Sequence, residues 1–155
     1  IESIFNNQID IINADFRDLE IKGTFDLIVS NPPFFVGNLN SVNTKRTQAR
    51  HTDTLSTELL LKKSFTLLKD KGRLAIIFPS ESDNHINYLA IKSGFFVKRK
   101  CHVFATIESK LSKRTLWEFS KSESIFNFSK LVIEKSRHVY TQEYIKLTRE
   151  FYLKM

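Results

Sequence analysis

The sequence predicts an α/β fold built on one mainly parallel sheet whose C-terminal edge is antiparallel. Three observations favour this class. Apolar strand-like runs alternate with helical patterns up to about residue 94, three strand candidates then follow without helices between them, and the chain has one domain's length of 155 residues, 41% of them apolar. Strand and helix alternation is typical of parallel sheets with crossovers, whereas consecutive strands pair as antiparallel neighbours.

Two short apolar runs in the first fifth of the chain predict buried strands. Residues 9–12 are rich in isoleucine and stop at the polar residues 13–15, and residues 25–30 stop at an Asn-Pro-Pro sequence. From Ser56 the pattern becomes helical, with Leu61, Phe65 and Leu68 at positions i, i+4 and i+7. Ser56 or Thr57 supplies a cap, and Gly72 marks the expected end of this helix.

The remaining elements follow from the same kinds of signal. Residues 73–78 predict a strand that ends at Pro79, and residues 82–93 predict a helix stopped by Gly94. Residues 95–104, 114–120 and 128–135 predict three further strands, so the sheet should end in antiparallel pairs. Residues 141–152 predict a closing helix.

Composition excludes several classes of protein. The single cysteine, Cys101, cannot form an internal disulfide or a zinc site built on several cysteines, and the four histidines show no metal-ligand spacing, so no metal is expected. No apolar run approaches the roughly 18 residues of a membrane span, so we expect no membrane association and a cytoplasmic location. Residues 1–60 carry 5 basic and 8 acidic side chains and residues 61–155 carry 19 and 9, which favours a polyanionic partner for the second part.

The strongest functional signal is the tetrapeptide Asn31-Pro32-Pro33-Phe34, directly after the strand at 25–30. In an open α/β sheet, ligands bind at the carboxyl ends of the strands, which is where this sequence would lie. The prolines stiffen the turn and offer no N–H. Asn31 and Pro32 then present two fixed carbonyl acceptors, and Phe34 presents an aromatic face. The plainer alternative is that Asn-Pro-Pro only ends a strand and Phe34 caps the core.

This arrangement suits a planar amine such as adenine N6. Two hydrogen bonds from the amine to the carbonyl oxygens of Asn31 and Pro32 would hold the nitrogen toward a tetrahedral shape, which directs its lone pair at an electrophile held in line. Phe34 could stack on the base, a contact worth about 1–3 kcal/mol.

On these residues the chain resembles the Rossmann-like class I amino-methyltransferases that use S-adenosylmethionine. The resemblance assigns the amine to Asn31 and Pro32 and the stacking contact to Phe34. It also implies that Asp15 binds the amino group of the cofactor adenine, that Phe16 flanks this ring, and that Asn31 borders the cofactor. Taken alone, Asp15 is more often a turn or cap residue.

Two further segments narrow the resemblance. The sequence Gln48-Ala49-Arg50-His51-Thr52 and the tail from Tyr140 to Leu153 look like those of the bacterial enzymes that methylate adenine N6 at position 37 of valine tRNA. Transfer to guanine N2 of rRNA or to a protein glutamine through the same turn stays open. So does a non-catalytic RNA-binding fragment of the same fold.

The chain lacks the glycine-rich turn that the resemblance implies for the cofactor. None of its four glycines forms a G-x-G pattern. We therefore expect residues 1–155 to be the C-terminal two thirds of a single methyltransferase domain, inactive without the N-terminal strand and helix units. A sheet that lacks those strands would have unpaired edges, which could lead to self-association or strand exchange.

Basic side chains mark the expected tRNA surface. Those after the Asn-Pro-Pro turn lie in a long polar connection, and the others lie on or between two predicted strands. Solvated surface charge is the alternative for both groups. The residues are Lys45, Arg46, Arg50, Lys98, Lys100, Lys113 and Arg114.

Overall fold

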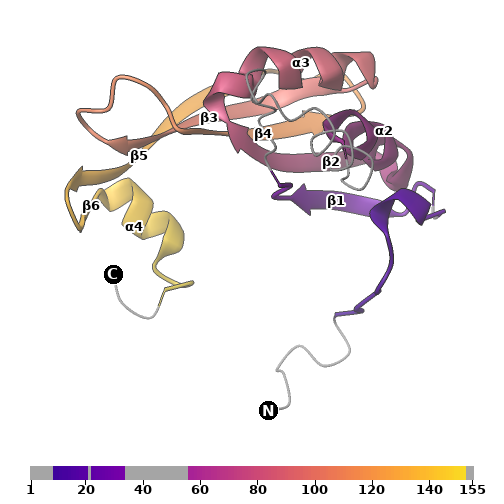
Figure 1. Cartoon of the computed structure of the whole chain (residues 1–155), viewed down its shortest axis with the longest axis horizontal. Helices are drawn as coiled ribbons and strands as arrows, with labels where there is room; N and C mark the ends of the chain where they lie inside the picture. Colours follow the sequence, from indigo (N-terminus) through magenta and orange to yellow (C-terminus); the bar gives the residue numbers. More distant parts are fainter. Residues whose placement is uncertain (1–8, 21, 34–55, 153–155) are drawn as a thin grey trace, which may run out of the picture.

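A six-stranded mixed sheet forms the centre of the computed structural model, which describes residues 9–20, 22–33 and 56–152 (Figure 1). The strands lie in the order β1-β2-β4-β3-β5-β6. Their bounds are β1 Phe25–Ser30, β2 Leu68–Pro79, β3 Phe96–Thr106, β4 Arg114–Ser120, β5 Asn127–Ser136 and β6 Val139–Tyr140.

The pairing confirms the predicted α/β sheet with an antiparallel C-terminal part. Strand β1 is parallel to β2, whereas β4 lies antiparallel between β2 and β3. Strand β6 is antiparallel to β5, but β5 is parallel to β3, whereas the sequence predicted only antiparallel pairs among the last three strands. The sheet is therefore mixed. No local signal predicts that β4 lies between β2 and β3, because strand order depends on contacts between distant segments.

Helices α2 and α4 begin at capping residues present in the sequence, and α3 ends just before its predicted glycine. Ser56 caps α2, since its hydroxyl accepts a hydrogen bond from the main-chain N–H of Leu59 at 3.2 Å. Gly94, at φ +91°, follows α3 in a conformation that favours glycine. Thr141 caps α4 in the same way as Ser56 caps α2. The bounds are α2 Thr57–Leu67, α3 Asp83–Lys92, α4 Gln142–Thr148, and short 3-10 turns η1 Phe16–Asp18 and η2 Ser80–Ser82.

The boundary between α2 and β2 differs from the prediction. The helix was expected to continue to Gly72, but it ends at Leu67, and β2 starts at the next residue. Leu68 pairs with Phe25 of β1 and is fully buried, so the strand pairing outweighs the helical pattern at this point. At Gly72 the two strands come so close that a Cβ would lie 2.8 Å from the carbonyl oxygen of Phe25.

The main core lies between one face of the sheet and the helices α2 and α3. Leu74 and Ile76 of β2 and Leu61 of α2 belong to it. Phe119 is completely buried, and its ring stacks on Trp117 with 5.5 Å between the ring centroids. Trp117 and Phe119 therefore belong to the packed core against the sheet.

Two predictions about the first strands are wrong. Residues 9–12 form no strand, and Ile11 is 92% exposed. Strand β1 forms with the predicted bounds, but it is not buried, since Val29 is 72% exposed. Within the described ranges, β1 pairs only with β2, and no strand lies beside residues 9–12 to satisfy their N–H and C=O groups.

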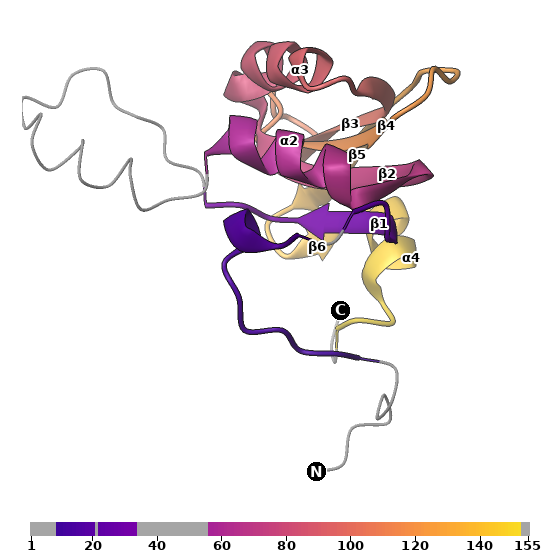
Figure 2. The same ribbon diagram turned by 90° about the vertical axis from the view of Figure 1, so that its right-hand side faces the viewer.

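The two faces of the sheet are covered unequally. Helix α3 lies on one side of the sheet and α4 on the other, against β5, as both ribbon views show (Figure 2). Between β1 and α4, the second face carries exposed side chains such as Leu116. In the part of the chain that the structure describes, no helix has the length and apolar character needed to cross a membrane.

Candidate active site

Asn31 lies at the point where β1 ends, one residue after Ser30. Because β1 and β2 are parallel, with Ser30 opposite Ile76, both strands end at the same edge of the sheet. Asn31 is exposed and Pro32 is buried, so the turn is anchored by its first proline while the amide side chain stays accessible. Asn31 lines a pocket of about 440 Å³, called here the Asn31 pocket.

The Asn31 pocket opens on the sheet face that α2 and α3 do not cover. Side chains alternate along a strand, and Ile76 of β2 points into the main core, so its neighbours Ala75 and Ile77 point to the opposite face. The β4 residues paired with them, Glu118 and Leu116, lie on this face too. The pocket wall is therefore mostly apolar, and its polar members are Ser30, Asn31, Ser129 and the charged pair Glu118 and Arg99.

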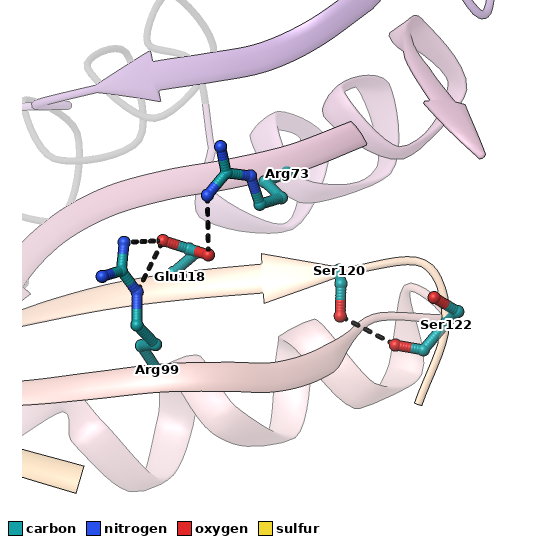
Figure 3. A network of polar contacts seen from close by, with 5 residues as sticks. All are labelled: Arg73, Arg99, Glu118, Ser120 and Ser122. Atoms are coloured by element: carbon teal, nitrogen blue, oxygen red, sulfur yellow. Dashed lines mark hydrogen bonds and ion pairs between the residues drawn. The ribbon is translucent and has the colours of Figure 1, made fainter. Parts of the chain in front are cut away.

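Glu118 is held between two arginines (Figure 3). Its side chain is only 8% exposed, and its Oε2 accepts hydrogen bonds from Nε of Arg99 at 2.8 Å and from Nη2 of the same residue. Nη1 of Arg73 donates to Oε1 at 3.3 Å. Burial raises the pKa of Glu118, but the hydrogen bonds and charges of Arg99 and Arg73 outweigh it and hold this pKa below its ordinary value.

Sequence reasoning missed this network. The available signal was a carboxylate between two aromatic residues of a predicted strand, since Glu118 lies between Trp117 and Phe119. An acidic side chain in such a strand needs a cationic partner when its face becomes covered. The partners themselves come from β2 and β3, so the sequence could not name them.

The turn provides the acceptors that an amine needs. The side chain of Asn31 lines the pocket, and the carbonyl of Pro32 stands on the next residue of the chain. An amine bound there would donate both of its N–H groups while its planar ring entered the pocket. Phe34, the expected stacking residue, lies outside the described residues.

Asp15 takes a local structural role. It caps η1, where its Oδ1 accepts from the main-chain N–H of Arg17 at 2.8 Å and its Oδ2 accepts from Nε of Arg17 at 2.9 Å and from Nη2 at 2.6 Å. These hydrogen bonds, first those from the side chain, lower the pKa of Asp15. Phe16 follows it as the first residue of η1 and is half-buried. Neither residue lines the Asn31 pocket.

These residues fit S-adenosylmethionine in part. A carboxylate has about four acceptor positions, and Asp15 uses three of them, so one position can still accept the adenine amino group. The methionine part of the cofactor needs closely spaced main-chain N–H groups from a glycine-rich turn, and the 155 residues contain no such turn. The chain thus offers a contact for the adenine end, whereas its sequence contains no glycine-rich turn for the methionine end.

The structure separates the predicted RNA-binding residues on β3 and β4. Lys98 lies near the beginning of β3, at an irregularity in its pairing with β4. Lys100 forms contacts within the protein: its Nζ lies 2.8 Å from Oδ2 of Asp83 and 4.5 Å above the ring of Trp117. Lys113 and Arg114 remain exposed at the edge where β2 ends. Lys45, Arg46 and Arg50 lie outside the described residues.

No metal centre is evident in the part of the chain that the structure covers. Within residues 9–20, 22–33 and 56–152, no three His, Cys, Asp or Glu side chains come together as metal ligands would. His102 instead contacts Asp83, with 2.8 Å between Nε2 and Oδ2, and Cys101 lies on the other face of β3 in the Asn31 pocket.

The fold is an α/β fold of the class I methyltransferase type. A crystal structure described as a predicted O-methyltransferase, protein Atu636 from Agrobacterium tumefaciens, superimposes with a TM-score of 0.69 over 94% of this chain and 64% of its own. The two sequences are only 17% identical, so this likeness concerns the fold.

The sequence comparison is more specific. The family model described as Eco57I restriction-modification methylase matches residues 1–126, and the chain belongs to this family. A Bacteroides fragilis protein named tRNA1(Val) (adenine(37)-N6)-methyltransferase is 38% identical over 99% of the chain. A Trichodesmium erythraeum protein of the same name is 42% identical over 84% of the chain. The chain spans 65% and 54% of the lengths of these two relatives.

Proposed function

We propose that the chain carries the amine-binding part of a methyltransferase that transfers a methyl group from S-adenosylmethionine to N6 of adenine 37 in tRNA1(Val). The observation that carries this proposal is the position of Asn31 and Pro32. Both lie at the carboxyl edge of β1, beside a pocket of about 440 Å³ with a mostly apolar wall. The names of relatives at 38% and 42% identity support the choice of substrate.

The residues of the turn would act mainly by positioning the amine of the target adenine. The Asn31 side chain and the Pro32 carbonyl accept the two N–H groups of N6, which turns the nitrogen lone pair toward the methyl group that the cofactor supplies. Phe34 stacks on the base, and Asp15 and Phe16 hold the cofactor adenine. The nitrogen loses its proton to solvent after it gains the methyl group, so no general base is needed.

Access to the base requires it to leave the anticodon loop. A stacked adenine cannot align with an in-line methyl donor, so the nucleotide is flipped out at a cost of a few kcal/mol. Lys113 and Arg114, exposed at the edge where β2 ends, support an approach of the tRNA from this side. The same proposal places the protein in the cytoplasm, where tRNA is modified, and involves neither a metal nor a membrane.

Labelled methyl transfer tests the proposal. Full-length protein is incubated with labelled S-adenosylmethionine and, separately, with total tRNA, rRNA and protein extract. We expect the label in tRNA, as N6-methyladenosine after digestion to nucleosides. Label in guanosine N2 or in glutamine would contradict the proposed substrate.

Cofactor binding separates an enzyme from a binding module. Calorimetry of the full-length protein with S-adenosylhomocysteine should show binding at one site. A lack of binding, together with retained affinity for tRNA, would favour an RNA-binding protein of the same fold.

A further inference from the structure

A second pocket, called here the edge pocket, lies at the same edge of the sheet as Asn31. It has a volume of about 380 Å³ and begins where β2 ends, at Pro79. The side chains of interest come from three places: the turn after β2, strand β3, and the start of β4 with the loop before it. They are Ser80, Glu81, Asp83, His102, Lys113 and Arg114.

The two basic residues of the edge pocket stand on fixed backbone. Arg114 pairs with Pro79 on one side and with Val103 on the other. The main-chain N–H of Lys113 donates to the carbonyl of Val103 at 2.9 Å, and the carbonyl of Lys113 accepts from the N–H of Ser80 at 3.4 Å. Both side chains therefore leave from backbone tied to β2 and β3 and are exposed. Nη1 of Arg114 donates to the carbonyl of Lys113 at 3.0 Å, which holds the guanidinium beside Ser80 and Lys113.

The acidic charge on one wall of this pocket is already compensated. Oδ2 of Asp83 lies 2.8 Å from both Nζ of Lys100 and Nε2 of His102. The side chain of Asp83 is only 14% exposed. Glu81 is then the remaining acidic residue of the lining, against the ammonium of Lys113 and the guanidinium of Arg114. The accessible part of the pocket thus favours an anion.

A hydroxyl adds a neutral donor to the two cations. Thr115, which is completely buried, donates its hydroxyl hydrogen to Oγ of Ser80 at 3.0 Å. Since Ser80 accepts this bond, its own hydroxyl hydrogen is available for a ligand. An ammonium, a guanidinium and a hydroxyl donor around one cavity are the groups that bind a phosphate.

We propose that the edge pocket binds one backbone phosphate of the RNA substrate, next to the nucleotide whose base enters the Asn31 pocket. Asn31 follows β1 and Arg114 begins β4, so the steps from β1 to β2 and from β2 to β4 separate these two residues along the edge. Two interstrand spacings amount to about 10 Å, which places the phosphate one or two nucleotides from the target base. The assignment rests on the proposed function and adds a defined subsite to it.

A synthetic anticodon stem-loop tests the assignment, with one phosphate at a time replaced by an uncharged methylphosphonate. Full-length protein is compared with the Lys113→Gln/Arg114→Gln variant and with the single Arg114→Gln variant. We expect one neutral linkage within two nucleotides of the target adenosine to weaken binding to the unaltered protein about tenfold. The same linkage should leave binding to the double variant nearly unchanged, because the partners of that phosphate are gone.

The salt dependence provides a second readout. The slope of log affinity against log salt should fall by about 0.7 in the double variant, the value for one phosphate contact on a single strand. Lys71→Gln, which removes an exposed charge near the start of β2, serves as the matched control and should respond to every linkage as the unaltered protein does. Equal unfolding temperatures of all variants exclude a folding defect.

The outcomes separate the two proposals. Methylation of the stem-loop with no linkage that distinguishes the double variant from the unaltered protein overturns the phosphate subsite and leaves the proposed function standing. Absence of both RNA binding and methyl transfer by the full-length protein overturns the proposed function. It also overturns the phosphate subsite, which rests on that function.

Discussion

Nε2 of His102 on β3 lies 2.8 Å from Oδ2 of Asp83, the first residue of α3, and the same oxygen contacts Nζ of Lys100. One carboxylate thus ties the beginning of the helix to the strand beneath it. This contact holds the start of α3 beside the edge pocket. Asp83 therefore contributes both to the stability of the fold and to the shape of that pocket.

Asp83→Ala should destabilise the protein by about 1–3 kcal/mol, because the ammonium of Lys100 and the imidazole of His102, both partly buried, lose their acceptor. Denaturant unfolding measures this difference. Glu81→Ala, which removes an exposed carboxylate two residues earlier, should change the free energy of unfolding far less. Equal effects of the two substitutions would show that the contacts of Asp83 contribute nothing to stability.

Glu118→Gln should weaken the sheet in a way that depends on pH. The folded-state pKa of Glu118 lies below its ordinary value of 4.5, so its stabilising effect is present above that value and is lost as the pH falls through the folded-state pKa. At neutral pH we expect a loss of about 1–3 kcal/mol, the usual range for hydrogen bonds to charged groups. Below pH 4.5 the difference between the two proteins should shrink. A constant difference across this range would contradict the assigned ion pairs.

Gly72→Ala should disturb the pairing that carries the Asn-Pro-Pro turn. The added methyl group would lie 2.8 Å from the carbonyl oxygen of Phe25 and 2.9 Å from that of Lys69, so the two strands must move apart. Overpacking of this kind costs about 1–3 kcal/mol. Lys71→Ala on the exposed neighbouring position is the control, and thermal unfolding of both variants provides the comparison.

Asn31→Ala should reduce turnover by about 100-fold or more, because one of the two acceptors that orient the amine is removed. Affinity for tRNA should change little, since the phosphate contacts remain. Asn84→Ala, an exposed amide on α3, serves as the control. Rates and affinities are measured separately on the full-length protein, and undiminished turnover of Asn31→Ala would remove this residue from the mechanism.

Local signals predicted the elements well, whereas tertiary contacts decided what those signals left open. The strands at 25–30 and 114–120 have the predicted bounds, since Asn31-Pro32 and the polar residues before Arg114 punctuate them clearly. Helix α2 is shorter than predicted because Leu68 pairs with Phe25 of β1. The isoleucines at 9–12 have strand propensity, but propensity alone cannot hold a strand without a partner.

The candidate site was predictable to the same extent. Asn31 and Pro32 could be predicted because the two acceptor groups stand on consecutive residues of the sequence. The partners of Glu118 and the lining of the edge pocket could not, because they come from strands whose order in the sheet is not encoded locally. Lys98, Lys100 and Lys113 looked equivalent in the sequence, yet the structure gives each a different environment.

The most direct test of the amine-binding role uses cells that lack the gene and receive it back in unaltered or Asn31→Ala form. The valine tRNA is purified from each strain, digested and analysed by mass spectrometry at position 37. We expect N6-methyladenosine with the unaltered gene and unmodified adenosine with the variant, at equal protein levels. N6-methyladenosine at the same level in both strains would contradict it.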